Sequence, residues 1–342
     1  MKSLRWTAFL AVAGILLSGC GRENAGTKEY TAYLFAHMTH SNYGHLYYSV
    51  SRDAVEWETL NEGKVILDGY LGHPNIVRAE ACGRIREEGG PGECFYMLGV
   101  TTEGDLRDPV LWYSRDLVSW NHLMLRRDIF DVSALGYENE SVYLGAPKIF
   151  YDEDNSRYMV TWHAFKPGIQ ENNPRWESMR TFYVLTSDWE NFTDAERIFD
   201  FDGDDASMAT IDAIFYKEGE KYYAVIKDER WPETSPSGKT IRIASSDSLT
   251  GPYCNPGESV TGAWEEAPVA VRKNDGGGWY LFTERYLQHR YCAYETESLS
   301  SGKWNSAEVS FPDQGRHGCV IPITEKEYLS LTETFRGNIG IE

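Results

Sequence analysis

The alternation of apolar and polar positions is most clearly patterned along residues 211–229. Two apolar, aromatic-rich runs flank a turn there that contains Gly219 and has charged shoulders. Such a pattern predicts a β-hairpin with buried strands. Asp212 opens the first run, and Asp228 and Glu229 close the second, so the hairpin brings its acidic ends to one edge of the sheet. We expect the chemistry of the protein at that edge.

Similar units recur along the chain at intervals of about 50 to 70 residues. Each unit has an aromatic-rich strand, followed by a second strand that carries Ser or Thr, an acidic residue and an aromatic residue a few positions further on. The first strands are expected at residues 33–37, 94–98, 157–162, 221–225 and 278–282. Almost no helical periodicity separates the units. The pattern therefore predicts an all-β fold, a five-bladed β-propeller, with a β-sandwich as the alternative.

The acidic residue of each second strand has a local explanation. Asp and Ser side chains bind backbone amides one to three residues ahead and so form turns, which applies to Ser51 with Asp53 and to Ser114 with Asp116. We interpret these acids as turn-forming and not as catalytic. Most aromatic side chains are expected to pack between blades, and only those near strand starts at the axis are candidates for binding a sugar.

The first residues carry a targeting pattern. Lys2 and Arg5 precede an apolar run over residues 6–17, and Leu17-Ser18-Gly19-Cys20 follows. This resembles a bacterial lipoprotein signal, in which residues 1–19 are removed and Cys20 is lipidated. Residues 20–29 are then a tether and residues 30–342 a single propeller domain. We expect a periplasmic or cell-surface protein that meets the membrane only through this anchor; an ordinary secretory signal or anchor is the alternative.

The net charge limits the kinds of partner, and the cysteine content limits the disulfides. The formal net charge of −19 argues against nucleic acid as a partner, and we expect a monomer. Six cysteines less a lipidated Cys20 leave an odd number, so at least one thiol stays free. Cys82 and Cys94 flank a Gly-rich stretch at residues 88–92, and whether they form a disulfide stays open.

Four short motifs carry a family resemblance. They are Gly145-Ala146-Pro147-Lys148, Ile211-Asp212-Ala213, Glu265-Glu266-Ala267-Pro268 and Arg316-His317-Gly318. In this order they resemble glycoside hydrolase family 43, in particular its lipoprotein relatives, over about residues 30 to 331. The resemblance implies a five-bladed propeller that hydrolyses arabinosides, xylosides and related sugars, the galactosides included, with inversion, by means of three axial carboxylates.

The resemblance assigns roles to two carboxylates. Glu266 would be the general acid, and Asp212 would orient it and keep its pKa high, as a neighbouring carboxylate does. An inverting glycosidase also needs a base about 6.5 to 9.5 Å from the acid, to activate water. The alternatives are a solvated turn acid for Glu266 and a hairpin cap for Asp212.

The base position departs from the family pattern. His73 stands where the family has an Asp, within residues 71–78. His73 is either the base or a sugar-contacting or structural residue, with the base elsewhere or absent. We expect the acidic axis to raise the pKa of His73. An Arg107-Asp108-Pro109 sequence opens a different strand, and we interpret it as a coincidence.

Further residues are candidates for the sugar pocket. Lys148 and Gly145 replace a Glu and an aromatic residue of the family and indicate a changed pocket. Candidate sugar contacts are Arg285, Arg316, Trp162, Lys148 and His37. The two arginines have a simpler alternative role, the neutralisation of the acidic axis.

His317 has three possible roles: a ligand of a calcium or sodium ion on the axis, a substrate contact, or a buried hydrogen-bonded side chain. We expect no required cofactor. Two function classes stay open, a glycoside hydrolase that acts on plant-type or host glycans and a non-catalytic carbohydrate-binding propeller.

Overall fold

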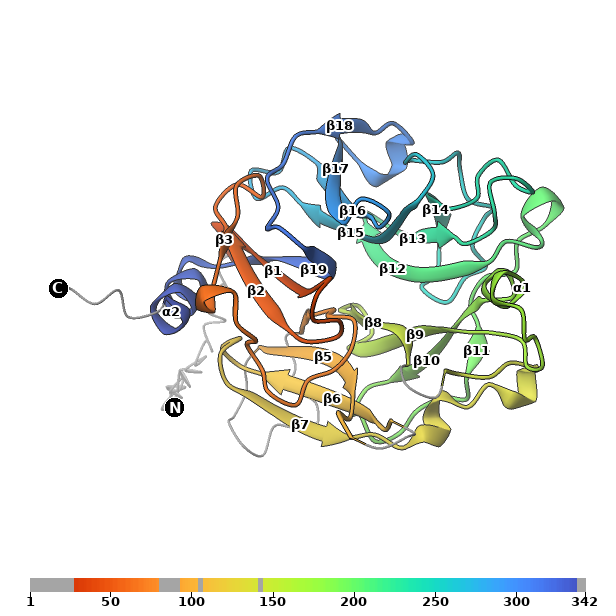
Figure 1. Ribbon diagram of the computed structural model, residues 1–342, viewed down its shortest axis with the longest axis horizontal. Helices are drawn as coiled ribbons and strands as arrows, with labels where there is room; N and C mark the ends of the chain where they lie inside the picture. Colours follow the sequence, from red (N-terminus) through yellow and green to blue (C-terminus); the bar gives the residue numbers. More distant parts are fainter. Residues whose placement is uncertain (1–27, 80–92, 104–106, 141–143, 337–342) are drawn as a thin grey trace, which may run out of the picture.

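Five antiparallel sheets surround one axis in the computed structural model, which describes residues 28–79, 93–103, 107–140 and 144–336 (Figure 1). Each sheet is one blade, and the innermost strand of each lies at the axis. The five-bladed propeller predicted from the repeats is confirmed, and the β-sandwich alternative is wrong.

Within the described residues, four blades have four strands and one has three. The first blade joins β19 (Gly315–Ile323) to β1 (Ala32–Thr39), β2 (Tyr47–Ser51) and β3 (Glu58–Thr59). The second consists of β4 (Val77–Ala79), β5 (Cys94–Val100), β6 (Pro109–Ser114) and β7 (Trp120–Met124). The third consists of β8 (Gly145–Asp152), β9 (Arg157–Ala164), β10 (Arg180–Thr186) and β11 (Glu196–Arg197). The fourth consists of β12 (Thr210–Glu218), β13 (Lys221–Asp228) and β14 (Thr240–Ser246). The fifth consists of β15 (Glu265–Arg272), β16 (Trp279–Arg285), β17 (Arg290–Thr296) and β18 (Asn305–Ala307).

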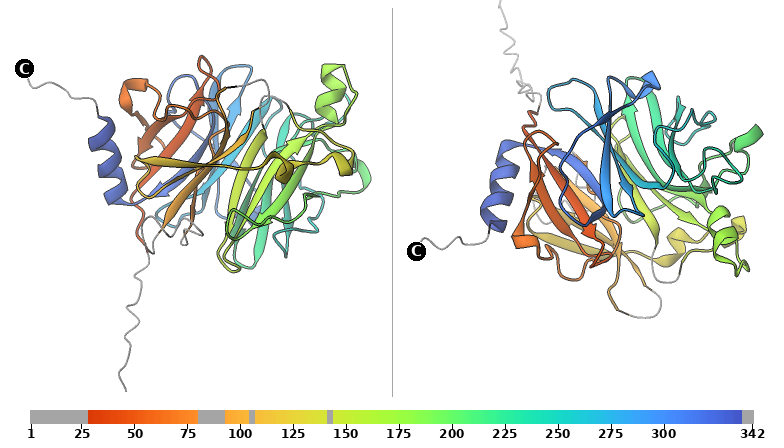
Figure 2. Two further views of the ribbon diagram at one scale, coloured as in Figure 1. Left: turned by 90° about the horizontal axis from the view of Figure 1, so that it is seen from below. Right: turned by 45° about the horizontal axis from the view of Figure 1, so that its top comes forward.

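Helices are few in the described ranges. The short α1 (Asn172–Glu177) rises above one face of the propeller, and α2 (Glu325–Phe335) lies at the outer rim beside the first blade (Figure 2). None of the described helices is long and apolar enough to cross a membrane. The described residues also form five short 3₁₀ helices: η1 (Asn61–Gly63), η3 (Arg127–Phe130), η4 (Ser133–Leu135), η5 (Gly203–Asp205) and η6 (Leu299–Ser301).

The hairpin predicted over residues 211–229 is formed by β12 and β13, with Thr210 opposite Asp228. The predicted turns are also present. The Ser51 hydroxyl donates to the Asp53 carboxylate at 3.0 Å, and that carboxylate accepts the backbone N–H groups of Val55 and Glu56. Equivalent bonds form at Ser114 with Asp116 and at Thr186 with Asp188. These acids therefore form turns.

Cys94 is disulfide-bonded, whereas Cys254, Cys292 and Cys319 are free thiols. Cys82, the candidate partner of Cys94, lies outside the described residues. The predicted signal and tether, residues 1–19 and most of 20–29, also lie outside them.

The inner strands share an irregularity that positions the site. β8, β12, β15 and β19 each carry one extra residue relative to the neighbouring strand. At these bulges four non-glycine residues have a positive φ: Ala146 (40°), Asp212 (50°), Ala267 (49°) and His317 (34°). A bulge bends the strand and turns side chains that the regular alternation would point elsewhere. The bulges of β12, β15 and β19 can therefore direct polar side chains toward the axis.

The first blade closes the ring through β19 and β1, which pair over residues 315–323 and 32–39. Phe35 is fully buried at this closure and packs edge-on against Trp57, Tyr291 and Phe311 at centroid distances of 5.0 to 5.7 Å. Gly318 lets the two strands approach, because a Cβ there would lie 2.6 Å from the Ala36 carbonyl oxygen. The tight contact at closure predicts that Gly318 cannot be enlarged.

Gly318→Ala is expected to lower the free energy of unfolding by about 1–3 kcal/mol, since overpacking at a buried contact costs that much. Thermal or urea unfolding measures the change. Gly262→Ala is the matched control, because a Cβ at Gly262 meets nothing within 4 Å. Equal stability of the two variants would contradict the close approach of β19 to β1 at Gly318.

Candidate active site

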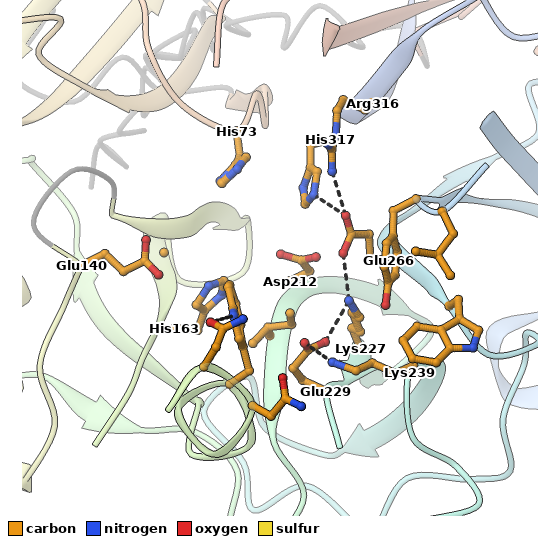
Figure 3. A pocket seen from close by; sticks show the side chains of 18 of the residues that line it. His73, Glu140, His163, Asp212, Lys227, Glu229, Lys239, Glu266, Arg316 and His317 are labelled. Atoms are coloured by element: carbon orange, nitrogen blue, oxygen red, sulfur yellow. Dashed lines mark hydrogen bonds and ion pairs between the residues drawn. The ribbon is translucent and has the colours of Figure 1, made fainter. Parts of the chain in front are cut away.

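A cavity of about 560 Å³ lies at the end of the axis where the inner strands begin. Asp212 and Glu266 lie at its base with His317, and His73 and Arg316 also line it (Figure 3). These five are the sequence candidates that the fold brings together. Asn172 and Trp176 of α1 also line the cavity.

Asp212, Glu266 and His317 come from β12, β15 and β19, the inner strands of three successive blades. One ligand atom from each lies within 4.8 Å of the other two. The Asp212 carboxylate accepts the backbone N–H of Ala267 at 3.2 Å. Asp212 and His317 are themselves the positive-φ residues of their bulges, and Glu266 directly precedes one. The bulges therefore bring the three side chains together.

Three cationic side chains surround Glu266. Lys227 Nζ lies 2.8 Å from one carboxylate oxygen of Glu266, and Arg316 Nη2 and His317 Nε2 each lie 3.0 Å from the other. Only 13% of the Glu266 side-chain surface is exposed. Burial alone would raise the pKa of Glu266, but Lys227 and His317 outweigh it and hold the pKa well below its usual value.

Glu266 is therefore ionised, which corrects the expectation that Asp212 keeps it protonated. Positive charge on Lys227, Arg316 and His317 dominates over the single neighbouring carboxyl group. The predicted role of Glu266 as proton donor is at odds with this state, because an ionised carboxylate has no proton to give.

The cationic network extends along β13 and β14. Lys227 also pairs with Glu229 at 2.8 Å, and Lys239 pairs with the second oxygen of Glu229. All three side chains are buried. Burial alone would lower the pKa of Lys227, but Glu266 and Glu229 outweigh it and raise the pKa above its ordinary value. Lys227 thus holds its charge beside Glu266.

His73 lies on the cavity wall, and its Nε2 is 2.5 Å from the Tyr43 hydroxyl. Burial lowers the pKa of His73 well below 6.5, and the charges of His317 and Lys148 lower it further. We expected the acidic axis to raise the pKa of His73, and this was wrong. Burial and the two cationic neighbours outweigh the acidic residues. His73 is therefore a neutral imidazole and a weak base.

Two predicted sugar contacts belong to the core instead. His37 is buried, its Nε2 lies 3.1 Å from the Ser49 hydroxyl, and burial lowers its pKa to about 4. Trp162 is 1% exposed and donates from Nε1 to the Asn139 amide oxygen at 2.9 Å. Neither lines the cavity, because both point to the blade-packing face of their strands.

Lys148, Arg285 and Asp108 are also absent from the cavity wall. Lys148 is buried on β8, where burial lowers its pKa. Arg285 donates from Nε to the buried Glu265 carboxylate at 2.9 Å, and this bond raises the pKa of Arg285. Asp108 pairs with Arg127. Arg316 is the predicted sugar-contact residue that does line the cavity.

A family model described as "probable glycosyl hydrolase domain" and related to glycoside hydrolase family 43 matches residues 28–329. The chain belongs to this family. No curated protein sequence matches the chain significantly.

Several solved glycosidase structures share the fold of this chain. An α-L-arabinanase of Penicillium chrysogenum, in complex with arabinobiose, is 12% identical with a TM-score of 0.53; the match covers 85% of this chain and 84% of that one. An α-L-arabinofuranosidase of Fusarium graminearum is 12% identical with a TM-score of 0.52, over 84% of this chain and 82% of that one.

The "Xyloglucan PUL GH43B" protein of Bacteroides ovatus is 15% identical with a TM-score of 0.46, over 72% of this chain. The match spans 43% of that protein and 52% of an exo-β-1,3-galactanase of Phanerochaete chrysosporium, about half the length of each.

Several cavity residues of this family member were not predicted from the sequence. They are Tyr43, Glu140, His163, Trp176, Lys227, Trp231, Lys239, Trp264 and Tyr286. Glu229 had been placed at the candidate edge by the hairpin pattern, and Lys227 had a usable signal, since it lies near the end of β13, the strand paired with the one that carries Asp212. Gly145 was a second signal, because it allows β9, which carries His163, to lie close to the cavity. A Cβ at position 145 would clash with the His163 carbonyl oxygen. Trp231 and Trp264 lie in loops and Trp176 lies on the short α1, and no sequence pattern indicated any of them.

The axial triad is close enough to hold a metal ion, but its surroundings do not favour one. His317 Nε2 is directed at Glu266 and not at a shared centre, and Lys227 and Arg316 already compensate the carboxylate. Calcium prefers an oxygen-rich set without adjacent cations. The residues of this triad and their cationic neighbours therefore do not fit a metal ion.

The pairing with Glu266 predicts the titration of His317. Burial alone would lower the pKa of His317, but Glu266 outweighs it and raises the pKa above 6.5. Glu266→Gln is expected to shift the NMR titration midpoint of the His317 ring downward, whereas Glu265→Gln leaves it unchanged. Because the folded pKa is raised, the pair stabilises the protein below pH 6.5 and loses this effect as pH rises through that pKa. An unshifted midpoint would contradict the pairing.

Proposed function

We propose that this protein is a glycoside hydrolase that cleaves a glycosidic bond in the axial cavity. The supporting observation is the convergence of Asp212 and Glu266 from two blades on one cavity that is open to solvent. The positive charge that develops at the anomeric carbon needs nearby anionic groups, and an ionised Glu266 supplies one without a change of protonation.

The cavity walls suit a sugar ring. Trp231, Trp264 and Tyr286 form a cluster with centroid distances of 5.6 and 6.2 Å on one side, and Trp176 of α1 lines another part of the wall. Aromatic faces pack on the C–H groups of sugars while charged side chains bind their hydroxyls. The proposed substrates are arabinosides, xylosides or galactosides of plant-type or host glycans, the class that the family resemblance implies. The fold relatives with TM-scores above 0.5, an arabinanase and an arabinofuranosidase, support the first of these.

We propose an inverting reaction in which water attacks the anomeric carbon from the axial side. Asp212 lies at the base of the cavity and would position this water, with Glu266 beside it. His73 is a weak base because of its lowered pKa. We propose that His73 and Tyr43 together contact the sugar. This contact would take the place of the Asp that the family has at the position of His73.

The second candidate function is carbohydrate binding without catalysis. One observation favours it: both oxygens of Glu266 are engaged by cations, so the axis presents an ionised acid. The two functions differ in product. A hydrolase releases reducing sugar, whereas a binding protein only retards a polysaccharide in an affinity gel.

Glu266→Gln is the test of the site, because Gln keeps the shape of Glu266 and removes its charge. On the aryl glycoside or glycan that the purified protein hydrolyses, kcat is expected to fall at least about 100-fold. Glu265→Gln is the matched control, since Glu265 precedes it on β15 but is fully buried against Thr283 and Tyr294. An active Glu266→Gln variant would refute the site, and wild-type retardation in the gel without sugar release would favour the binding function.

We also propose that Cys20 anchors the protein to a bacterial membrane, on the basis of the Leu17-Ser18-Gly19-Cys20 sequence. Cys20→Ala is expected to move the protein from the membrane fraction to the soluble fraction, because a lipidated cysteine would be its membrane attachment. Fractionation and immunoblotting measure the distribution. Continued membrane retention would show another mode of attachment.

A further inference from the structure

Hydrolysis of a glycosidic bond needs a proton donor at the leaving oxygen. Glu266 is ionised, and Glu229 is bridged by Lys227 and Lys239. Neither carboxylate can therefore supply the proton. Burial raises the pKa of Glu284, but this side chain is ion-paired with Arg316 and does not line the cavity. The donor must be sought elsewhere on the cavity wall.

Glu140 is the remaining carboxyl group on that wall besides Asp212. Its side chain is half-buried, and within the part of the chain that the structure describes it forms no hydrogen bond or ion pair. Figure 3 shows Glu140 and Glu266 on opposite sides of the cavity, with Asp212 between them. A sugar bound over Asp212 would therefore have a carboxyl group on either side.

The segment that leads to Glu140 is firmly attached to the third blade. Glu138 and Phe165 exchange two backbone hydrogen bonds of 2.9 and 3.1 Å. The Asn139 side chain donates to the Phe130 carbonyl at 2.7 Å and accepts from Trp162 at 2.9 Å. Buried Trp162, which the sequence suggested as a sugar contact, is thus a positioning residue next to Glu140.

We propose that Glu140 is the catalytic acid of this hydrolase, which protonates the glycosidic oxygen across the cavity from Glu266. The inference rests on the proposed function. Burial raises the pKa of Glu140, and the positive charge of Arg175 on α1 opposes this only in part. The two carboxyl groups thus have pKa values shifted in opposite directions, as an acid and an anionic partner require.

In the proposed inverting hydrolysis, the Glu140 proton moves to the glycosidic oxygen, which leaves with the electron pair of the broken C–O bond. Water forms the new C–O bond at the anomeric carbon and gives one proton to the Asp212 carboxylate, which positions this water. Exchange with solvent then removes that proton and restores the one on Glu140, so the net change is the addition of one water.

Leaving-group dependence tests this assignment. A dinitrophenyl glycoside of the sugar that the wild type releases departs without protonation, whereas the natural sugar linkage does not. Glu140→Gln is expected to lower kcat about 10²- to 10⁴-fold on the natural linkage and far less on the dinitrophenyl glycoside. It should also abolish the fall of activity at alkaline pH that the wild type shows when Glu140 loses its proton.

Glu138→Gln is the matched control, because Glu138 is exposed, lies two residues away and binds Phe165 only through its backbone. It is expected to behave as wild type. Equal losses on both substrates, a change in KM alone, or no loss would overturn the assignment of Glu140. If Glu140→Gln does not fold, Glu140→Asp keeps the charge, shortens the side chain and should show the same selective loss. A wild type that cleaves neither substrate overturns the proposed function and this inference with it.

Discussion

The bulges of the inner strands are the constraint on which the site depends. A regular strand sends successive side chains to opposite faces, and both faces of a blade are covered by neighbouring blades. One extra residue in β12, β15 and β19 breaks this alternation at the strand start and turns Asp212, Glu266 and His317 to the axis. The same bulge in β8 carries no acid and leaves Lys148 buried. The scaffold thus fixes positions on the axis, and the residues at those positions decide the chemistry.

Charge balance at the axis differs from that of the whole chain. The protein carries a formal net charge of −19, yet Glu266 is surrounded by Lys227, Arg316 and His317. A buried ion pair gains little stability, because the desolvation of both partners offsets their attraction. We therefore interpret this network as a set of contacts that holds the Glu266 carboxylate ionised in the cavity.

The departures from the family pattern are consistent with one another. His73 and Lys148 stand where the resemblance places acids. The pKa of Glu266 is low because the charges of Lys227 and His317 outweigh the effect of burial. A hydrolase with this axis needs a proton donor away from it, and Glu140, held at the cavity rim by the third blade, has the burial that such a donor requires.

The sequence by itself determined the number of blades and the turn-forming acids, because strand period and turn chemistry are local properties. Short motifs, which are also local, indicated that Asp212, Glu266, Arg316 and His317 lie where inner strands begin. Only the tertiary structure decided ionisation and exposure, because these depend on groups that are distant along the chain. Lys227 and His317 hold Glu266 ionised from other blades. His37 and Trp162 alternate to the packed face of their strands, which a residue type cannot reveal, and Glu140 gained its place from the contacts of its neighbours with Phe130 and Phe165.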